Sequence, residues 1–194
     1  MRIGVLALQG AFYEHEQALS KLGAQTFQIR TLPDLNPPLD GILLPGGEST
    51  VMGKLLHKNG LFAPIQTMIQ NGLPVYGTCA GLILLSKKIG DGAERWFSTM
   101  DLHSLRNAYG RQLASFADEG VFDGRTIPMV FIRAPKIQQV FGNAMPLGEC
   151  RGLVVAARQE NQLVTAFHPE LTECDAVHRY FLNMVEAARS KRGV

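Results

Sequence analysis

The sequence has 194 residues, of which 46% are hydrophobic and 19% charged, and its formal net charge is +2. This composition is typical of a globular domain with a sizeable core, and so small a charge argues against nucleic acid or an anionic membrane as a partner. No apolar run approaches the length of a membrane span. We expect no secretory signal, because Gln9, Glu14 and Glu16 closely follow the short apolar start.

The chain has three cysteines, Cys79, Cys150 and Cys174, and no CxxC pair. An odd number at wide spacing argues against a disulfide framework and against a structural zinc site. The sequence therefore predicts a protein of a reducing, cytoplasmic compartment.

In the first half of the chain, short apolar segments alternate with helical patterns. We expect strands over residues 2–8, 25–30, 40–44 and 73–77. We expect helices over residues 11–22, from an N-cap at Ser49 or Thr50 to about His57, over 61–70, and after Cys79. Residues 32–38 contain three prolines and are expected to hold no regular structure. The alternation favours a mostly parallel sheet with helices on both faces.

The second half of the chain has a different character. Residues 91–150 are richer in glycine, proline and polar residues, with short β-like pieces such as 130–133. Residues 151–157 and 162–167 predict a hairpin that turns at Glu160-Asn161, and a final helix is expected from about 174 to 188. No repeat or long linker interrupts the chain, so we expect one domain over residues 1–194.

The segment Gly77-Thr78-Cys79-Ala80-Gly81 has the pattern of a nucleophile elbow. Small residues two positions either side of a Ser or Cys allow the backbone to turn sharply from a strand into a helix. A cysteine at a helix N-terminus is also favoured as the thiolate, the reactive form. The alternative is a structural cysteine that packs beside two glycines.

A thiol nucleophile needs a base, and the segment Phe167-His168-Pro169-Glu170 offers one. His168 ends an apolar strand, which is where parallel-sheet enzymes place their sites. Residues two apart in extended chain face the same way, so Glu170 is expected to reach the imidazole. A solvated turn is the alternative. None of the other histidines, His15, His57, His103 and His178, has a carboxylate so placed at the end of an apolar strand.

Two further motifs suggest substrate contacts. Gly46-Gly47 follows a strand and offers backbone N–H groups to an oxyanion, although a simple turn before a helix has the same pattern. Arg106 and Arg133 suit a substrate carboxylate, since a guanidinium binds one through two parallel hydrogen bonds. Ordinary surface ion pairing is the alternative for each arginine.

Six ordered motifs then identify a family: LALQGAFYEH, LPGGEST, GTCAGLILL, RNAYGRQ, FIRAP and TAFHPELT. Over nearly its whole length, the chain resembles the class I (triad) glutamine amidotransferases. Within that family it is similar to the glutaminase subunits of two-component pyridoxal 5′-phosphate synthases.

The resemblance implies a flavodoxin-like three-layer α/β/α fold and hydrolysis of L-glutamine to glutamate and ammonia, with no metal or organic cofactor. It implies that Cys79 is the nucleophile, His168 the acid/base and Glu170 its orienting residue. The implied oxyanion hole consists of the backbone N–H groups of Gly47 and Ala80, and the implied partner is the ammonia-accepting synthase subunit. The positions that match the glutamine-binding residues of the family are Gly46, Gly47, Glu48, Arg106, Ile132 and Arg133.

Three other interpretations compete with this one. A different triad amidotransferase, such as the glutaminase for imidazole glycerol phosphate synthesis, does not share the RNAYGRQ and FIRAP motifs. A thiol peptidase leaves Arg106 and Arg133 without a role. A non-catalytic subunit is disfavoured by the intact set of Cys79, His168 and Glu170.

Overall fold

The computed structural model describes residues 1–90, 95–106 and 115–193. The elements in chain order are β1 (Arg2–Leu6), α1 (Phe12–Lys21), β2 (Gln25–Ile29), η1 (Leu32–Leu35), β3 (Gly41–Leu44), α2 (Ser49–Lys58), α3 (Phe62–Gln70), β4 (Val75–Thr78), α4 (Ala80–Leu85), β5 (Ser86–Ile89), β6 (Met100–Leu105), β7 (Ser115–Phe122), β8 (Arg125–Ile132), β9 (Lys136–Val140), β10 (Met145–Cys150), β11 (Leu153–Gln159), β12 (Gln162–Thr165), η3 (Pro169–Leu171) and α5 (Ala176–Arg192).

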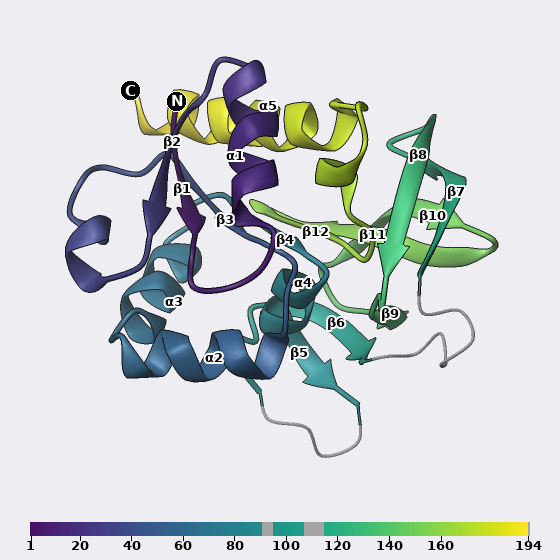
Figure 1. Cartoon of the computed structure of the whole chain (residues 1–194), viewed down its shortest axis with the longest axis horizontal. Coiled ribbons are helices and arrows are strands. Elements are labelled where there is room, and N and C mark those ends of the chain that lie inside the picture. Colours follow the sequence, from purple (N-terminus) through teal and green to yellow (C-terminus); the bar gives the residue numbers. More distant parts are fainter. Residues whose placement is uncertain (91–94, 107–114, 194) are drawn as a thin grey trace.

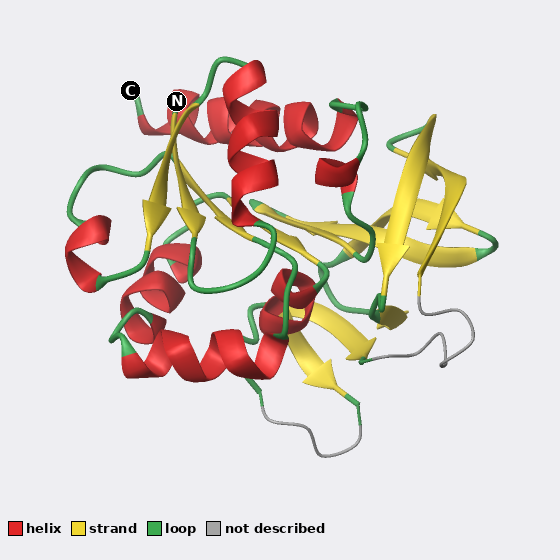
Figure 2. Ribbon diagram, viewed as in Figure 1, coloured by secondary structure: helices red, strands yellow, loops and turns green. Residues whose placement is uncertain are grey.

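A nine-stranded sheet in the order β2-β1-β3-β4-β12-β11-β10-β7-β8 runs through the molecule. Its pairs from β2 to β12 are parallel. The helices α1 and α5 cover one face of this parallel part, and α2, α3 and α4 cover the other, as Figures 1 and 2 show. The predicted three-layer α/β/α architecture is therefore confirmed.

The parallel strands have apolar sequences because both faces are covered. Every residue of β3, β4 and β12 is buried. The carboxyl ends of β1, β3, β4 and β12 lead into the loops after residues 6, 44, 78 and 165. Because parallel strands end at the same edge of a sheet, all four loops lie together, which is where α/β proteins bind their ligands.

Beyond β12 the sheet is antiparallel, since β11, β10, β7 and β8 each pair in that sense. A second sheet, in the order β5-β6-β9, lies beside it. The expected hairpin is confirmed, with Gln159 opposite Gln162 and a two-residue turn between them. The central sheet is thus more mixed than the sequence predicted, because the polar middle of the chain forms full strands rather than short pieces.

Two local predictions were wrong. Residues 32–35 form the 3₁₀ helix η1, with Pro33 in its first turn, where no N–H is needed. The Asp34 carboxylate accepts hydrogen bonds from the backbone N–H groups of Thr31 (2.7 Å) and Arg30 (2.9 Å). The N-cap of α2 is Glu48 rather than Ser49 or Thr50. Its carboxylate accepts hydrogen bonds from the N–H groups of Thr50 (3.2 Å) and Val51 (2.8 Å), which have no partner within the helix.

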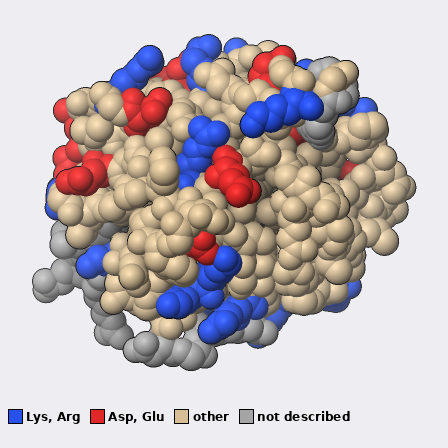
Figure 3. All heavy atoms as spheres, turned by 180° about the vertical axis from the view of Figure 1, so that it is seen from behind, with Lys and Arg blue, Asp and Glu red and all other residues tan. Residues whose placement is uncertain are grey.

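The surface carries both signs of charge, and on the face seen in Figure 3 acidic and basic side chains are interspersed. Within the described ranges, none of the helices has the combination of length and apolar character that crossing a membrane requires.

Candidate active site

Cys79 occupies the turn between β4 and α4 in a strained conformation. Its φ of 51° and ψ of −96° lie outside the regions that a residue with a side chain normally adopts. Its N–H donates to the Thr165 carbonyl of β12 (2.8 Å), which holds the turn against the sheet. Backbone strain of this kind persists where the surrounding structure enforces it, and it is typical of a nucleophile elbow. The elbow prediction is thereby supported by geometry.

The flanking glycines allow the close approach that this turn requires. A Cβ atom on Gly81 would lie 2.3 Å from the Leu44 carbonyl oxygen, and one on Gly77 would lie 2.6 Å from the Gly81 carbonyl carbon. Backbone atoms cannot move aside as a flexible side chain can.

We therefore expect Gly81→Val to lower the free energy of unfolding by about 3 kcal/mol through overpacking. Ser20→Val, on the exposed side of α1, should change it by no more than about 0.5 kcal/mol. Chemical denaturation of both variants measures the difference, and equal effects would show that the elbow does not need glycine.

His168 and Glu170 form a buried hydrogen-bonded pair beside the elbow. His168 Nδ1 donates to Glu170 Oε1 at 2.6 Å, and the His168 N–H donates to the Val130 carbonyl of β8 (2.7 Å). Burial alone would lower the pKa of His168, but Cys79 and Glu170 outweigh it and raise the pKa to about 10. The protonated imidazole is therefore favoured between a thiol and a carboxylate.

The Nε2 atom of His168 makes no hydrogen bond to any of the described residues and lines the same pocket as Cys79. The ring edge also contacts the glycine loop, because a Cβ atom on Gly46 would lie 2.4 Å from His168 Cε1. The nitrogen not used by Glu170 is thus the one available to the thiol and to a substrate.

Hydrogen bonds from the β1–α1 loop hold the Gly46-Gly47 loop that follows β3. The side-chain Oε1 of Gln9 accepts a hydrogen bond from the Glu48 N–H at 2.7 Å, and the Ala11 N–H donates to the Gly46 carbonyl at 3.1 Å. Ala80 is the first residue of α4, where backbone N–H groups have no partner within the helix. Gly47 and Ala80 thus remain as the predicted oxyanion-hole residues.

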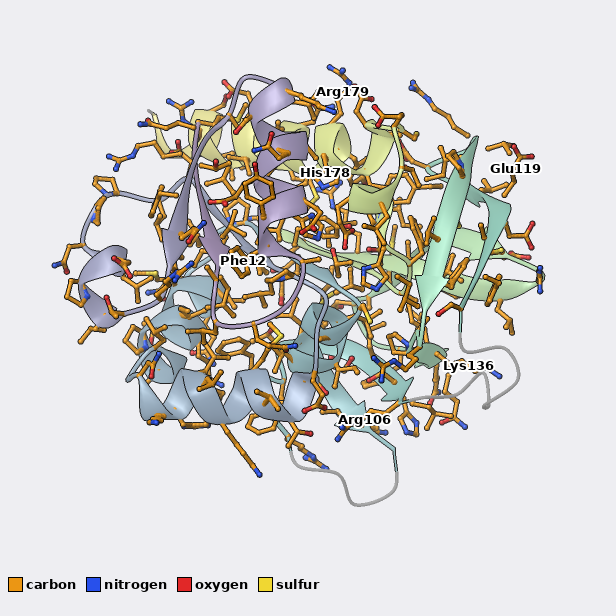
Figure 4. All side chains as sticks on the ribbon, in the orientation of Figure 1. Phe12, Arg106, Glu119, Lys136, His178 and Arg179 are labelled. Atoms are coloured by element: carbon orange, nitrogen blue, oxygen red, sulfur yellow. The ribbon has the colours of Figure 1, made fainter. Side chains whose placement is uncertain are left out.

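An ion pair between Glu48 and Arg106 lines the pocket. Arg106 Nη2 lies 2.9 Å from Glu48 Oε1, and the two side chains are 39% and 47% exposed. Burial opposes ionisation of Glu48, but the amides of Val51 and Thr50, together with Arg106, lower its pKa. Figure 4 shows Arg106 at the end of β6. The rest of the predicted RNAYGRQ motif, residues 107–112, lies outside the described residues.

These groups surround a pocket of about 450 Å³, a size usual for small-molecule sites. Of the predicted site residues, Ala80 and Glu170 do not line the pocket. The residues that do line it are Gly46, Gly47, Glu48, Cys79, Arg106, Ile132, Arg133 and His168. Arg133 has a positive φ of 41°, so it too is held in an unusual conformation.

The described residues contain no cluster of His, Cys, Asp or Glu side chains suited to a metal ion. All three cysteines are free thiols, and Cys150 and Cys174 lie away from the pocket lining. The site thus presents a thiol, an imidazole–carboxylate pair and the charged pair of Glu48 and Arg106.

The family model of the SNO glutamine amidotransferases matches residues 5–187. The chain belongs to this family. It is 57% identical to the pyridoxal 5′-phosphate synthase subunit PdxT of Methanocorpusculum labreanum, over 95% of this chain and 98% of that relative. It is 50% identical to PdxT of Streptococcus pneumoniae, over 95% and 97% of the two chains.

Solved structures agree with this membership. A glutamine amidotransferase crystal structure superimposes on this SNO family member with a TM-score of 0.90 and 38% identity, over 95% of this chain and 98% of that one. PurLQS of Thermotoga maritima has a TM-score of 0.72 at 15% identity, over 94% and 97% of the two chains. At such low identity the second match shows the fold alone.

Sequence reasoning missed several residues of this amidotransferase site. Gln9, Ile83 and Leu171 line the pocket, although no role was predicted for them. A larger omission is His15, whose Nε2 lies 3.4 Å from Glu170 Oε2. The sequence comparison of the histidines considered only carboxylates close along the chain at a strand end, so it did not identify this contact of a helical histidine. The position of His15 on the apolar face of α1, beside Leu19, was a usable signal, since a buried histidine needs a polar partner.

Proposed function

We propose that this chain is the glutaminase subunit of a pyridoxal 5′-phosphate synthase, hydrolysing L-glutamine to L-glutamate and ammonia with Cys79, His168 and Glu170 as its catalytic triad. The observation that carries the proposal is the strained Cys79 turn beside the His168–Glu170 pair, in one pocket with Glu48 and Arg106. Family membership and the names of the curated relatives support the substrate and the pathway.

The charged pair of Glu48 and Arg106 suits the amino-acid part of glutamine. Glu48 and Arg106 carry opposite charges and are partly exposed, so an α-ammonium and an α-carboxylate group can replace their contact with each other. Gly46, Gly47, Ile132 and Arg133 line the space between, and the side-chain amide then extends towards Cys79.

In the reaction, the Cys79 thiolate attacks the side-chain carbonyl carbon of glutamine. The N–H groups of Gly47 and Ala80 hold the oxyanion that develops. His168 gives its Nε2 proton to the leaving nitrogen as the C–N bond breaks, and ammonia departs. His168 then takes a proton from water, which attacks the γ-glutamyl thioester and releases glutamate and the thiolate.

Ammonia released into water would be protonated and lost as a nucleophile, so the reaction is useful only when a partner takes it up. The proposed partner is the synthase subunit, and the proposed location is the cytoplasm. We assign the whole of residues 1–194 to a single glutaminase domain.

Co-purification with the synthase subunit, followed by a product assay, tests this function. We expect product formation from either glutamine or ammonium salts. Product formation from ammonium salts but not from glutamine would contradict the assignment. If glutamate were released but its ammonia did not reach the product, only the proposed partner would be contradicted.

Loss of the charged pair in the pocket should weaken substrate binding more than chemistry. We expect Arg106→Ala to raise KM for glutamine about 10-fold to 100-fold, with a smaller change in kcat, since a hydrogen-bonded charge pair contributes about 1.5–3 kcal/mol. Arg179→Ala removes an exposed arginine that also pairs with a carboxylate, Asp175, and should leave KM unchanged. An unchanged KM in Arg106→Ala would exclude this arginine from the binding site.

A further inference from the structure

A row of buried polar side chains extends from Glu170 of the proposed triad to His15 and His178. His15 of α1 is 0% exposed and His178 of α5 is 1% exposed. His15 Nδ1 lies 2.9 Å from His178 Nε2, and His15 Nε2 lies 3.4 Å from Glu170 Oε2. Figure 4 shows His178 between α1 and α5. The two oxygens of Glu170 therefore face different histidines, His168 and His15.

The charges of Glu170, His15 and His178 favour one arrangement of protons. Burial outweighs the attraction of Glu170 and lowers the pKa of His15, and burial likewise lowers the pKa of His178 to about 3. Both rings are thus neutral at ordinary pH, and a neutral imidazole has a single N–H. His15 Nε2 faces Glu170 Oε2 at 3.4 Å without a hydrogen bond between them, and because the carboxylate repels a bare ring nitrogen, we assign the His15 proton to Nε2. His15 Nδ1 then accepts from His178 Nε2–H.

The same arrangement fixes His168. Its Nδ1–H donates to Glu170 Oε1, so Nε2 is the nitrogen that exchanges a proton with Cys79 and the substrate. Burial opposes ionisation of Glu170, but His15 and His168 together lower its pKa. Without His15, the ring that faces Oε2 at 3.4 Å would be lost, and the buried carboxylate would be free to turn away from His168.

The packing around the two rings leaves them little freedom. The Tyr76 ring meets His15 edge-on at a centroid distance of 5.9 Å and His178 at 6.1 Å. Neither histidine lines the substrate pocket, so any effect of theirs on the reaction passes through Glu170.

We propose that His15 and His178 are positioning residues of the glutaminase site, which hold the outer oxygen of Glu170 and thereby fix the aim and tautomer of His168. This inference rests on the proposed function. It adds α1 and α5 to the elements that the reaction depends on.

The test compares His15→Leu with His15→Gln in the complex with the synthase subunit, assayed for glutamate release. Leucine fills similar space without a donor, whereas the glutamine amide nitrogen reaches the position of Nε2. We expect His15→Leu to lower kcat about 10-fold to 100-fold, as loss of a residue that orients a functional group does elsewhere. KM for glutamine should stay within about twofold, since Glu48 and Arg106 are untouched. His15→Gln should recover most of the loss.

His57 is exposed and makes no contact with the buried histidines, so it supplies the matched control. His57→Gln should have the same activity as the wild type. If His15→Leu fails to fold, as judged by thermal unfolding, His178→Phe replaces it in the same comparison, because it removes the donor to His15 Nδ1. The inference would be overturned if His15→Leu, or His178→Phe where it is used instead, had the kcat of the wild type. It would also be overturned if that variant and His15→Gln lost activity equally. An inactive wild-type complex would instead overturn the proposed function.

Discussion

Cys79→Ala should abolish glutamine hydrolysis, with kcat falling on the order of 10⁴-fold or more, because no other group in the pocket can form the thioester. Glutamine should still bind, since the groups proposed to hold its α-ammonium and α-carboxylate are unchanged. Glutamate release in the presence of the synthase subunit measures the loss, and calorimetric titration of the complex measures the binding.

The other two cysteines provide matched controls for this experiment. Cys150 is buried in β10, where its thiol lies 3.7 Å from the Glu119 carbonyl oxygen, and Cys174 precedes α5. Cys174→Ala should retain wild-type activity, as should Cys150→Ala once its folding is verified. The variant complex should also still make product from ammonium salts. Persistent glutamate release by Cys79→Ala would remove this residue from the mechanism.

Glu170→Gln should lower kcat by about 10³-fold to 10⁴-fold with little change in fold. The Glu170 carboxylate accepts from His168 and faces His15 Nε2 at 3.4 Å, whereas an amide has one accepting oxygen and one donating nitrogen. One of the two histidines must then change its tautomer or lose its contact. A wrong tautomer of His168 removes the base, which costs a serine protease about 10⁴-fold when its aspartate is replaced by asparagine.

The pH profile separates this effect from a general loss of structure. Glu170 is one of the groups that raise the pKa of His168 to about 10, so its neutralisation should lower that pKa. The protonated imidazole needed for the leaving nitrogen is then lost at lower pH, and the basic limb of the kcat profile should move towards acid. A profile of unchanged shape, merely scaled down, would argue that Glu170 does not control His168.

The sequence predicted the parallel half of the fold and the chemical core of the site because both depend on local signals. Unbroken apolar runs are typical of strands buried on both faces, and the glycines around Cys79 indicate a tight turn. His168 and Glu170 are two residues apart, so extended backbone alone brings their side chains together.

The missed features depend on distant contacts or on competing roles for one side chain. His15 and Glu170 are 155 positions apart, and no local pattern reports their contact at 3.4 Å. Glu48 was predicted to bind substrate, yet it also caps α2, which displaced the expected caps Ser49 and Thr50. The polar composition of residues 91–150 suggested short pieces, but pairing across β7, β8 and β10 stabilises full strands.

Covalent trapping of the nucleophile tests the central claim most directly. A glutamine analogue with an electrophilic carbon in place of the side-chain amide is incubated with the complex, and the modified peptide is identified by mass spectrometry. We predict one adduct, on Cys79, whose formation L-glutamine suppresses and Arg106→Ala slows. Modification of Cys150 or Cys174 instead, or an unmodified Cys79 in a complex that still releases glutamate, would contradict the account.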